Sequence, residues 1–181
     1  PGEGRIFSSK EEVLLAYQYG QISLHSRIVI PARVLEKTSF TTEQEKALLV
    51  TTCGKILFNE IFPPEFPYIN VADRKNLLVG TPDEYFIFDK GADLTAFVSK
   101  VPVKGAVVKS FLGAIIGECF SRYGTTRAAE ILDRVKRLGF SYSTKAGITI
   151  SVADIYVPKQ KEEIVAEAEK KEDTVVMQFR R

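Results

Sequence analysis

Glycines divide the second half of the sequence into helical segments, and this division constrains the fold more than any other feature. The segment 106–123 is followed by Gly124, and the segment 126–138 is followed by Gly139. Helices commonly end just before a glycine, and Thr126 is a typical N-cap residue. Since only two residues separate the two helical patterns, we expect the helices to pack against each other as a helical hairpin.

The remaining patterns predict short strands mixed with short helices. Ser9 and Glu12 have the spacing of a capping box, which predicts the start of a helix. A β-branched run at 27–30 ends at Pro31, which predicts an edge strand because proline donates no ladder hydrogen bond. The apolar run 48–52 predicts a second strand. Further elements are expected at 55–61 (a short helix) and at 140–143 and 148–150 (short strands). Together these patterns predict an α+β fold.

Composition divides the chain into four segments. The segment 71–104 is loop-like and rich in Gly, Pro and Asp, which is typical of a variable insertion, although Tyr85–Phe88 has the pattern of a short strand. We therefore expect an N-terminal part, the insertion, a part with the hairpin and short strands, and a final helix. Their predicted bounds are 1–70, 71–104, 105–158 and 159–181.

The final segment predicts a helix with a narrow apolar face. Its apolar positions on that face are Ile164, Ala168, Val175 and Phe179. So narrow a face cannot hold a helix in a wide core, but it suits one arm of an antiparallel coiled coil whose other arm is missing. The chain begins with Pro1 and reaches Arg181 without a helix stop signal. We therefore expect an excised segment whose last helix is frayed or pairs with a second copy.

The sequence offers little for catalysis or metal binding. It has one histidine and two cysteines, which exclude a Cys/His zinc site and a disulfide-rich scaffold. We expect Cys53 and Cys119 to pack as small hydrophobes. No two aspartates are closer than four residues, so a local two-metal carboxylate site is not encoded. No apolar run approaches the roughly 20 residues that span a bilayer, and we expect a reducing, cytoplasmic setting. We predict no catalytic residue, no metal ligand and no cofactor in this chain.

Basic residues gather in the middle of the chain. The net charge of the whole chain is only +2. Between Lys104 and Lys145, however, eight lysines and arginines face three acidic residues. Arg134, Lys136 and Arg137 on the second hairpin helix, with Arg127 before them, are candidates to line a path for phosphates. The alternative is that they form an ordinary solvated helix face.

Several segments resemble one family in collinear order along nearly the whole chain. These segments are Gln21–Arg27, Thr51–Glu60, Phe66–Asn70, Leu132–Phe140 and Ser143–Ile150. They are similar to the largest subunit of bacterial RNA polymerase, β′. The segment 71–104 matches weakly, as a variable insertion should. Cys53 departs from the family, which usually has a small aliphatic residue there, and this exchange keeps both size and apolarity.

The resemblance implies that the chain is a fragment of a DNA-directed RNA polymerase, a nucleotidyltransferase. It implies a place in the pore region, in the wall of the secondary channel through which nucleoside triphosphates enter. The aspartate motif that holds the catalytic Mg²⁺ is absent from this chain, so the isolated chain is expected to be inactive. Other polymerase subunits, the rest of β′ and, in the whole enzyme, nucleic acid are the implied partners, and no membrane is expected.

The resemblance also suggests roles for particular residues. Arg134, Arg137 and Lys145 are candidates for weak contacts with triphosphates; alternatively they bind neighbouring subunits or pair with Glu130 and Asp133. The final helix is similar to the first arm of the rim coiled coil, where transcript-cleavage factors dock. Candidate docking residues there are Glu162, Glu163, Glu167, Lys170 and Lys171; alternatively this is a solvated helix with internal pairs such as Glu167–Lys171. The alternative function is a free-standing interaction or nucleic-acid-binding module without catalysis.

Overall fold

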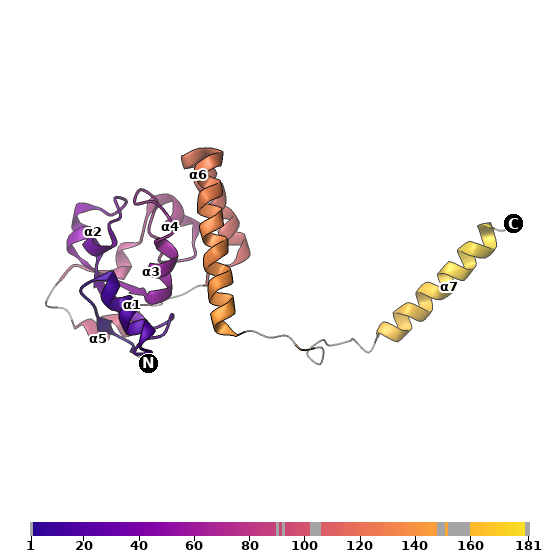
Figure 1. Ribbon diagram of the computed structural model, residues 1–181, viewed down its shortest axis with the longest axis horizontal. Helices are drawn as coiled ribbons and strands as arrows, with labels where there is room; N and C mark the ends of the chain where they lie inside the picture. Colours follow the sequence, from indigo (N-terminus) through magenta and orange to yellow (C-terminus); the bar gives the residue numbers. More distant parts are fainter. Residues whose placement is uncertain are drawn as a thin grey trace. The chain divides into compact units, whose positions relative to one another are not determined.

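The computed structural model describes residues 2–89, 91, 93–101, 106–147, 151 and 160–179. The chain divides into two compact units, Pro1–Ser141 and Tyr142–Arg181, and each is described by itself. The first unit holds a small sheet, short helices and most of a long bent helix (Figure 1). The second unit holds the end of that helix and one further helix.

A four-stranded mixed sheet forms the centre of the first unit. Its strands are β1 (Arg5–Ile6), β2 (Arg27–Pro31), β3 (Leu48–Thr52) and β4 (Phe86–Ile87), and they lie in the order β1-β2-β3-β4. β1 pairs parallel to β2, whereas β3 pairs antiparallel to both β2 and β4. A mixed sheet surrounded by helices confirms the predicted α+β class.

The prediction of an edge strand at 27–30 is wrong, because β2 lies inside the sheet. On one side Val29 pairs with Ile6 of β1, and on the other it pairs with Val50 of β3. Pro31 is the last residue of β2 and pairs only with Leu48 of β3. β1 does not reach Pro31, so the missing N–H costs the sheet no ladder bond on that side.

Short helices and turns surround the sheet. They are α1 (Lys10–Gln18), η1 (Ala32–Leu35), α2 (Thr42–Lys46), α3 (Cys53–Asn59), α4 (Arg74–Val79), η2 (Asp83–Tyr85) and α5 (Leu94–Lys100). The predicted cap of α1 is confirmed: the Ser9 hydroxyl accepts a hydrogen bond from the Glu12 N–H at 3.2 Å. The Glu12 carboxylate accepts from the Ser8 N–H at 2.7 Å. The strand at 48–52 is also confirmed, and the short helix expected at 55–61 begins and ends two residues earlier.

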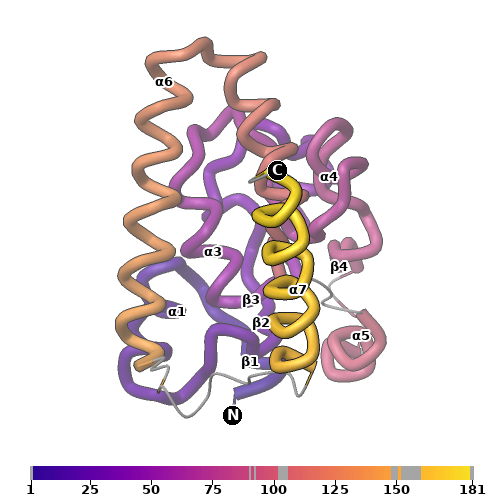
Figure 2. Tube along the Cα trace, turned by 90° about the vertical axis from the view of Figure 1, so that its right-hand side faces the viewer, coloured from indigo at the N-terminus to yellow at the C-terminus, as the bar shows by residue number. Residues whose placement is uncertain are grey.

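The predicted helical hairpin is confirmed in α6 (Lys109–Ala146). Figure 2 shows the parts before and after Gly124 running in opposite directions, and we call them the first and second arms. Gly124 adopts φ 71° and ψ 179°, a conformation that side chains with a Cβ rarely adopt. Gly124 is the only non-helical residue between the arms. Thr126 therefore lies inside the second arm, and its predicted N-cap role is wrong.

The second arm is longer than the sequence predicts. It continues through Gly139 to Ala146, so the strand expected at 140–143 is helical. Glycine inside a helix costs only about 1 kcal/mol relative to alanine, which the neighbouring residues supply. The helix ends before Gly147, which adopts φ 61°. The strand expected at 148–150 lies outside the described residues.

Two hydrophobic clusters make up the core of the first unit. Cluster one covers the sheet and includes fully buried Val13, Ile28 and Leu49. Cluster two lies where the end of α3 and the following turn meet both arms of α6, and it includes Phe62, Phe66, Phe111, Ile115 and Ile131. The segment 71–104 supplies buried residues to both clusters, among them Leu77, Phe86 and Val98. Its interpretation as a variable insertion, like the other segment bounds, stays a prediction.

The last helix, α7 (Lys161–Phe179), buries none of its residues. Ile164 is 64% exposed, Val175 62% and Phe179 93%. The apolar residues of this face are thus exposed, as expected, and Lys161–Phe179 forms a continuous helix. The expected pairing with a second copy stays a prediction. Within the described part of the chain, no helix combines the length and the apolar character that crossing a bilayer requires.

Candidate functional site

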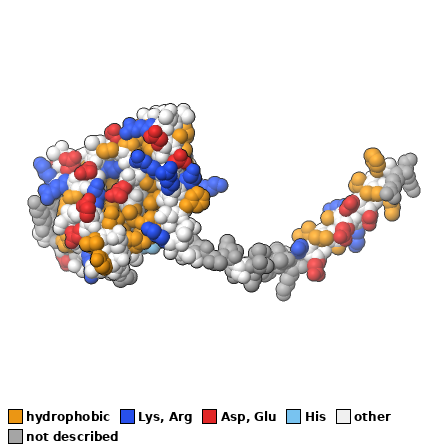
Figure 3. Space-filling view, in the orientation of Figure 1, with side chains coloured by type: hydrophobic (Ala, Val, Ile, Leu, Met, Phe, Trp, Pro, Cys, Tyr) orange, Lys and Arg blue, Asp and Glu red, His pale blue; other side chains and the backbone are white. Residues whose placement is uncertain are grey.

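The predicted basic residues of the second arm differ in what they contact. The Arg134 guanidinium donates a long hydrogen bond of 3.5 Å to the Ile61 carbonyl. Lys136, not Arg134 or Arg137, pairs with Asp133, at 2.7 Å. That hydrogen bond, with the charge of Lys136, lowers the pKa of Asp133. Arg137 is exposed. Figure 3 shows lysine and arginine side chains gathered over α6.

A cleft of about 530 Å³ lies where the end of α3 and the following turn approach the second arm. Arg134 belongs to its lining. The other charged residues that line it are Lys10, Glu36, Lys37, Glu60, Arg127 and Glu130. Four cations therefore face three carboxylates, so the cleft is nearly neutral. It does not form the concentrated positive site that would hold an anion tightly.

Lys37 lies at this cleft and is only 7% exposed. Its ammonium donates to the carbonyls of Asn59, Phe62 and Pro63 at 3.1 to 3.2 Å. These carbonyls belong to the last residue of α3 and to the turn that follows it. The last carbonyls of a helix have no partner within the helix and need another donor. Burial lowers the pKa of Lys37 to about 8, while the nearby Glu65 charge raises it. Lys37 therefore closes the end of α3 and has no donor left for a ligand.

Arginines and aromatic rings fix the tip of the hairpin. The Arg122 guanidinium lies 5.8 Å from the centre of the Phe66 ring, and Arg127 lies 4.9 Å from the centre of the Tyr123 ring. The rings of Phe66 and Tyr123 are themselves 6.4 Å apart. Arg127 also approaches the Glu65 carboxylate at 3.8 Å. Arg127, a candidate for the phosphate path, is thus engaged at the tip.

A network of buried asparagines was missed from the sequence. The Asn59 amide accepts from the Ile69 N–H at 2.7 Å and donates to the Ile69 carbonyl at 2.9 Å. The Asn76 amide accepts from the N–H groups of Asn70 and Val71 and donates to the Tyr68 carbonyl. These amides supply hydrogen-bond partners to the backbone of residues 68–71, which pairs with none of the four strands. For Asn59 and Asn70 the available signal was a polar residue inside the apolar segments 51–60 and 66–70, whereas Asn76 lies in the loop-like segment 71–104 and gave no such signal.

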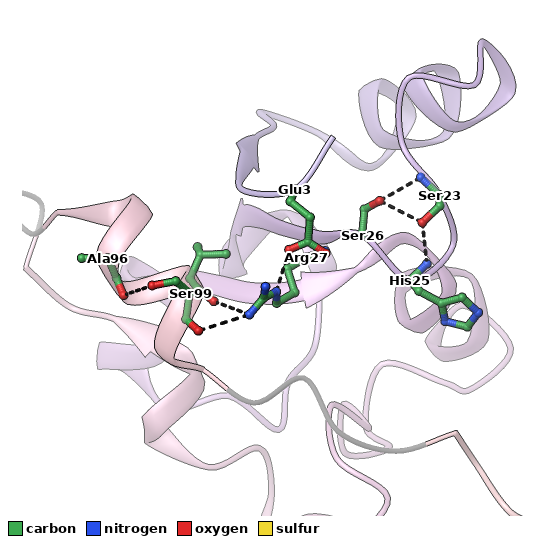
Figure 4. Close-up of polar contacts among 8 residues, drawn as sticks. Glu3, Ser23, His25, Ser26, Arg27, Ala96 and Ser99 are labelled. Carbon is green, nitrogen blue, oxygen red and sulfur yellow. Dashed lines mark hydrogen bonds and ion pairs between the residues drawn. The ribbon is translucent and has the colours of Figure 1, made fainter. Parts of the chain in front are cut away.

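Arg27 ties the first residues of the chain to α5. Its guanidinium pairs with the Glu3 carboxylate at 2.7 Å and donates to the Val98 carbonyl at 2.9 Å (Figure 4). In the neighbouring loop, His25 is exposed, and its N–H donates to the Ser23 hydroxyl at 3.3 Å. This region supports the sheet.

The remaining predicted residues belong to the second unit. Lys145 lies in the last turn of α6, and its ammonium is 4.9 Å from the centre of the Tyr142 ring. On α7, Lys171 pairs with Glu167 at 2.7 Å, as the alternative interpretation expected. Glu162, Glu163 and Lys170 are exposed on the same helix.

Both cysteines are buried, at 0% exposure for Cys53 and 2% for Cys119. Burial raises the pKa of each thiol to about 11, which disfavours the reactive thiolate. Among the residues described, no three histidine, cysteine, aspartate or glutamate side chains gather as a metal site. The described geometry is that of a scaffold with exposed charges on its helices.

The sequence comparisons identify this scaffold. The family model described as RNA polymerase Rpb1, domain 3, matches residues 3–155. The chain belongs to this Rpb1 domain 3 family. It is also 48% identical to the DNA-directed RNA polymerase subunit β′ of Bacillus subtilis strain 168 and of Bacillus velezensis. The corresponding subunit of Geobacillus kaustophilus is 51% identical.

Each of these similarities covers 180 residues, or 99% of this chain. The Rpb1 domain 3 chain spans about 15% of the length of these relatives. The resemblance to β′ stated from the sequence motifs is thereby confirmed. The similarity includes the segment 71–104, which contributes to both hydrophobic clusters.

Proposed function

We propose that this chain is a segment of a β′ subunit that forms part of the secondary-channel wall of a DNA-directed RNA polymerase. The observation that carries the proposal is the similarity to β′ along 99% of the chain, at close to half of its positions. In this role the segment lines the route by which nucleoside triphosphates reach the active centre. The reaction itself belongs to other parts of the polymerase.

Exposed cations that bind phosphate only weakly suit such a wall. A channel for triphosphates needs positive charge to attract anions, but tight sites would trap them. Arg134, Arg137 and Lys145 are all exposed, and Arg134 also donates a long hydrogen bond of 3.5 Å to the Ile61 carbonyl. All three stay candidates for transient phosphate contacts, and Arg137 and Lys145 are chosen for the test because Arg134 also contacts the turn after α3.

The helix α7 supplies the proposed docking rim. Its apolar residues are exposed, and its acidic and basic residues lie in short blocks of like charge along the helix. Such a surface suits regulatory and transcript-cleavage proteins, because complementary charge sets partner choice and association rate. Glu162, Glu163, Glu167, Lys170 and Lys171 remain the proposed docking residues, although the Glu167–Lys171 pair is already made within the helix.

Other polymerase subunits and the rest of β′ complete the proposed assembly. In it, the catalytic Mg²⁺ is bound outside this segment, so the isolated chain is proposed to be unable to polymerise nucleotides. Adding Mg²⁺, triphosphates and a primed template to the isolated chain tests this point. Any template-dependent incorporation by the chain would contradict it.

The channel role is tested by steady-state kinetics of a polymerase whose β′ contains this segment. The double variant Arg137→Ala with Lys145→Ala is expected to raise KM for triphosphates by roughly 2- to 5-fold at low salt, because two weak phosphate contacts are lost. kcat stays close to the parent value. The matched control is Lys136→Ala, which removes a cation already paired with Asp133. Equal KM values for the parent and the double variant would contradict the channel role.

The alternative function, a free-standing nucleic-acid-binding module, makes a different prediction. Such a module binds DNA by itself, with an affinity that falls steeply as salt rises. A titration of the isolated chain with duplex DNA at several salt concentrations separates the two functions. We expect only weak binding, because the chain as a whole carries a net charge of +2.

A further inference from the structure

The segment Thr51–Glu60 is one of the motifs shared with β′, and the fold explains most of its polar residues. The Thr51 and Tyr68 hydroxyls are hydrogen-bonded at 2.8 Å. The Thr52 hydroxyl caps α3 by accepting from the Lys55 N–H. A Cβ at Gly54 would lie 3.0 Å from the Leu24 carbonyl oxygen, a tight contact with backbone that disfavours a side chain there. Asn59 binds the extended segment, as described above.

The Lys55 ammonium is the exception within this motif. Its nitrogen is shielded from solvent, and among the described residues it has no hydrogen-bond partner. Phe58, one turn further along α3, packs with the Phe62 ring at 5.2 Å in cluster two. Helical spacing puts the Lys55 stem on this same apolar face. Burial lowers the pKa of Lys55 to about 8, and no charged neighbour among the described residues contributes to this shift.

Lys37 shows how this fold satisfies a buried lysine when the partner is internal. Both ammonium groups have a pKa lowered to about 8 by burial. Lys37 donates to three carbonyls, whereas Lys55 donates to none in the described part of the chain. A buried charge without a partner is costly, and proteins rarely keep one. The partner of Lys55 is therefore expected beyond this segment.

We propose that Lys55 is a docking point for a carboxylate that belongs to the rest of the β′ subunit. This inference rests on the proposed function, since it assumes that the chain is part of β′. The relatives are long enough to supply the carboxylate, because this chain spans only 15% of their length. Lys55 as a whole is partly exposed.

A protein carboxylate fits this position better than a nucleic-acid phosphate. Proteins bind nucleic-acid backbones with several exposed cations. Lys55 is the only basic residue in α3, and it lies against an apolar face. One desolvated ammonium matches one carboxylate, and the pair gains strength because water is excluded.

Thermal unfolding of the 181-residue chain tests whether the Lys55 ammonium is unpaired within this chain. Lys55→Met keeps the apolar stem and removes the charge, so Tm is expected to rise by roughly 2–4 °C. Lys37→Met is the matched control, and its Tm is expected to fall because three carbonyls lose their donor. A fall in Tm for Lys55→Met as large as that of the control would overturn the inference.

The pH dependence of unfolding gives a second readout. A lysine with a folded pKa of about 8 and an ordinary pKa of 10.5 binds fewer protons in the folded state between these values. Its charge therefore destabilises the fold below pH 8, and this cost disappears as pH rises to 10.5. Lys55→Met is expected to reduce the rise in stability across this window. An unchanged pH profile would contradict an unpaired ammonium.

The complete polymerase tests whether a carboxylate in the rest of β′ pairs with Lys55. There Lys55→Met is expected to lower the Tm of the β′ subunit, whereas Lys55→Arg keeps most of it. Unchanged values for Lys55→Met would overturn the carboxylate partner. So would a loss of DNA affinity with unchanged subunit stability, because that result indicates a phosphate. KM for triphosphates in the Arg137/Lys145 variant reports on the channel role separately.

Discussion

Asn59 shows how much of this fold depends on single polar side chains. It is 2% exposed, and its amide binds both the N–H and the carbonyl of Ile69. It also donates to the Lys55 carbonyl within α3. One amide therefore joins α3 to the extended segment that carries Phe66 into cluster two and Tyr68 into cluster one. Such links fix helices that no strand pairing holds.

Asn59→Ala is therefore expected to destabilise the chain. It leaves the Ile69 N–H and carbonyl buried without partners, at a cost of roughly 3 kcal/mol. Urea unfolding followed by circular dichroism measures the change. Gln18→Ala, which removes an exposed amide from α1, is the control and should stay within about 0.5 kcal/mol of the parent. A similarly small effect for Asn59→Ala would mean that water replaces the amide.

At the scale of elements, the sequence predicts best where a local rule decides the structure. The Ser9 cap, the strand at 48–52 and the hairpin break at Gly124 follow from capping chemistry, β-branched runs and glycine geometry. The interior position of β2 did not follow, because it depends on the distant two-residue strand Arg5–Ile6. The full length of the second arm was missed because a glycine can either end a helix or lie within one.

Gly124 lies at the break between the arms and Gly139 lies within a helix, so the two glycines give a matched pair of variants. Gly124 needs a positive φ, so Gly124→Ala is expected to destabilise the chain by about 1–2 kcal/mol. Gly139 lies in regular helix with open space around its Cα, so Gly139→Ala is expected to stabilise it by up to about 1 kcal/mol. Denaturant unfolding of both variants measures the signs. The same sign for both changes would contradict the description of α6.

The candidate site was only partly predictable for a related reason. The sequence placed the basic residues on the correct helix, but it did not show which of them the fold engages. Arg134 turned out to contact the Ile61 carbonyl, and Lys136 took Asp133. These contacts depend on how the second arm packs against the turn after α3, which sequence spacing along one helix does not report.

At the scale of the whole molecule, the chain is a scaffold whose chemistry is proposed to lie in other parts of a polymerase. Its sheet and hairpin form the first unit, and its last helix exposes an apolar face. The Rpb1 domain 3 family assignment and the length of the relatives fit a segment that is completed by its neighbours. The buried Lys55 ammonium and the exposed face of α7 are the two places where we expect those neighbours to bind.

Photo-crosslinking from position 137 tests the channel role most directly. The proposed channel is also expected to receive the RNA 3′ end when the polymerase backtracks. A photoreactive amino acid therefore replaces Arg137 in the β′ subunit of an assembled polymerase, and the enzyme is stalled in a backtracked state with its RNA 3′ end extruded. We predict crosslinks to the extruded RNA that disappear when the complex is restored to its forward register. Crosslinks that reach only DNA or another subunit, whatever the register of the RNA, would contradict a place in the channel wall.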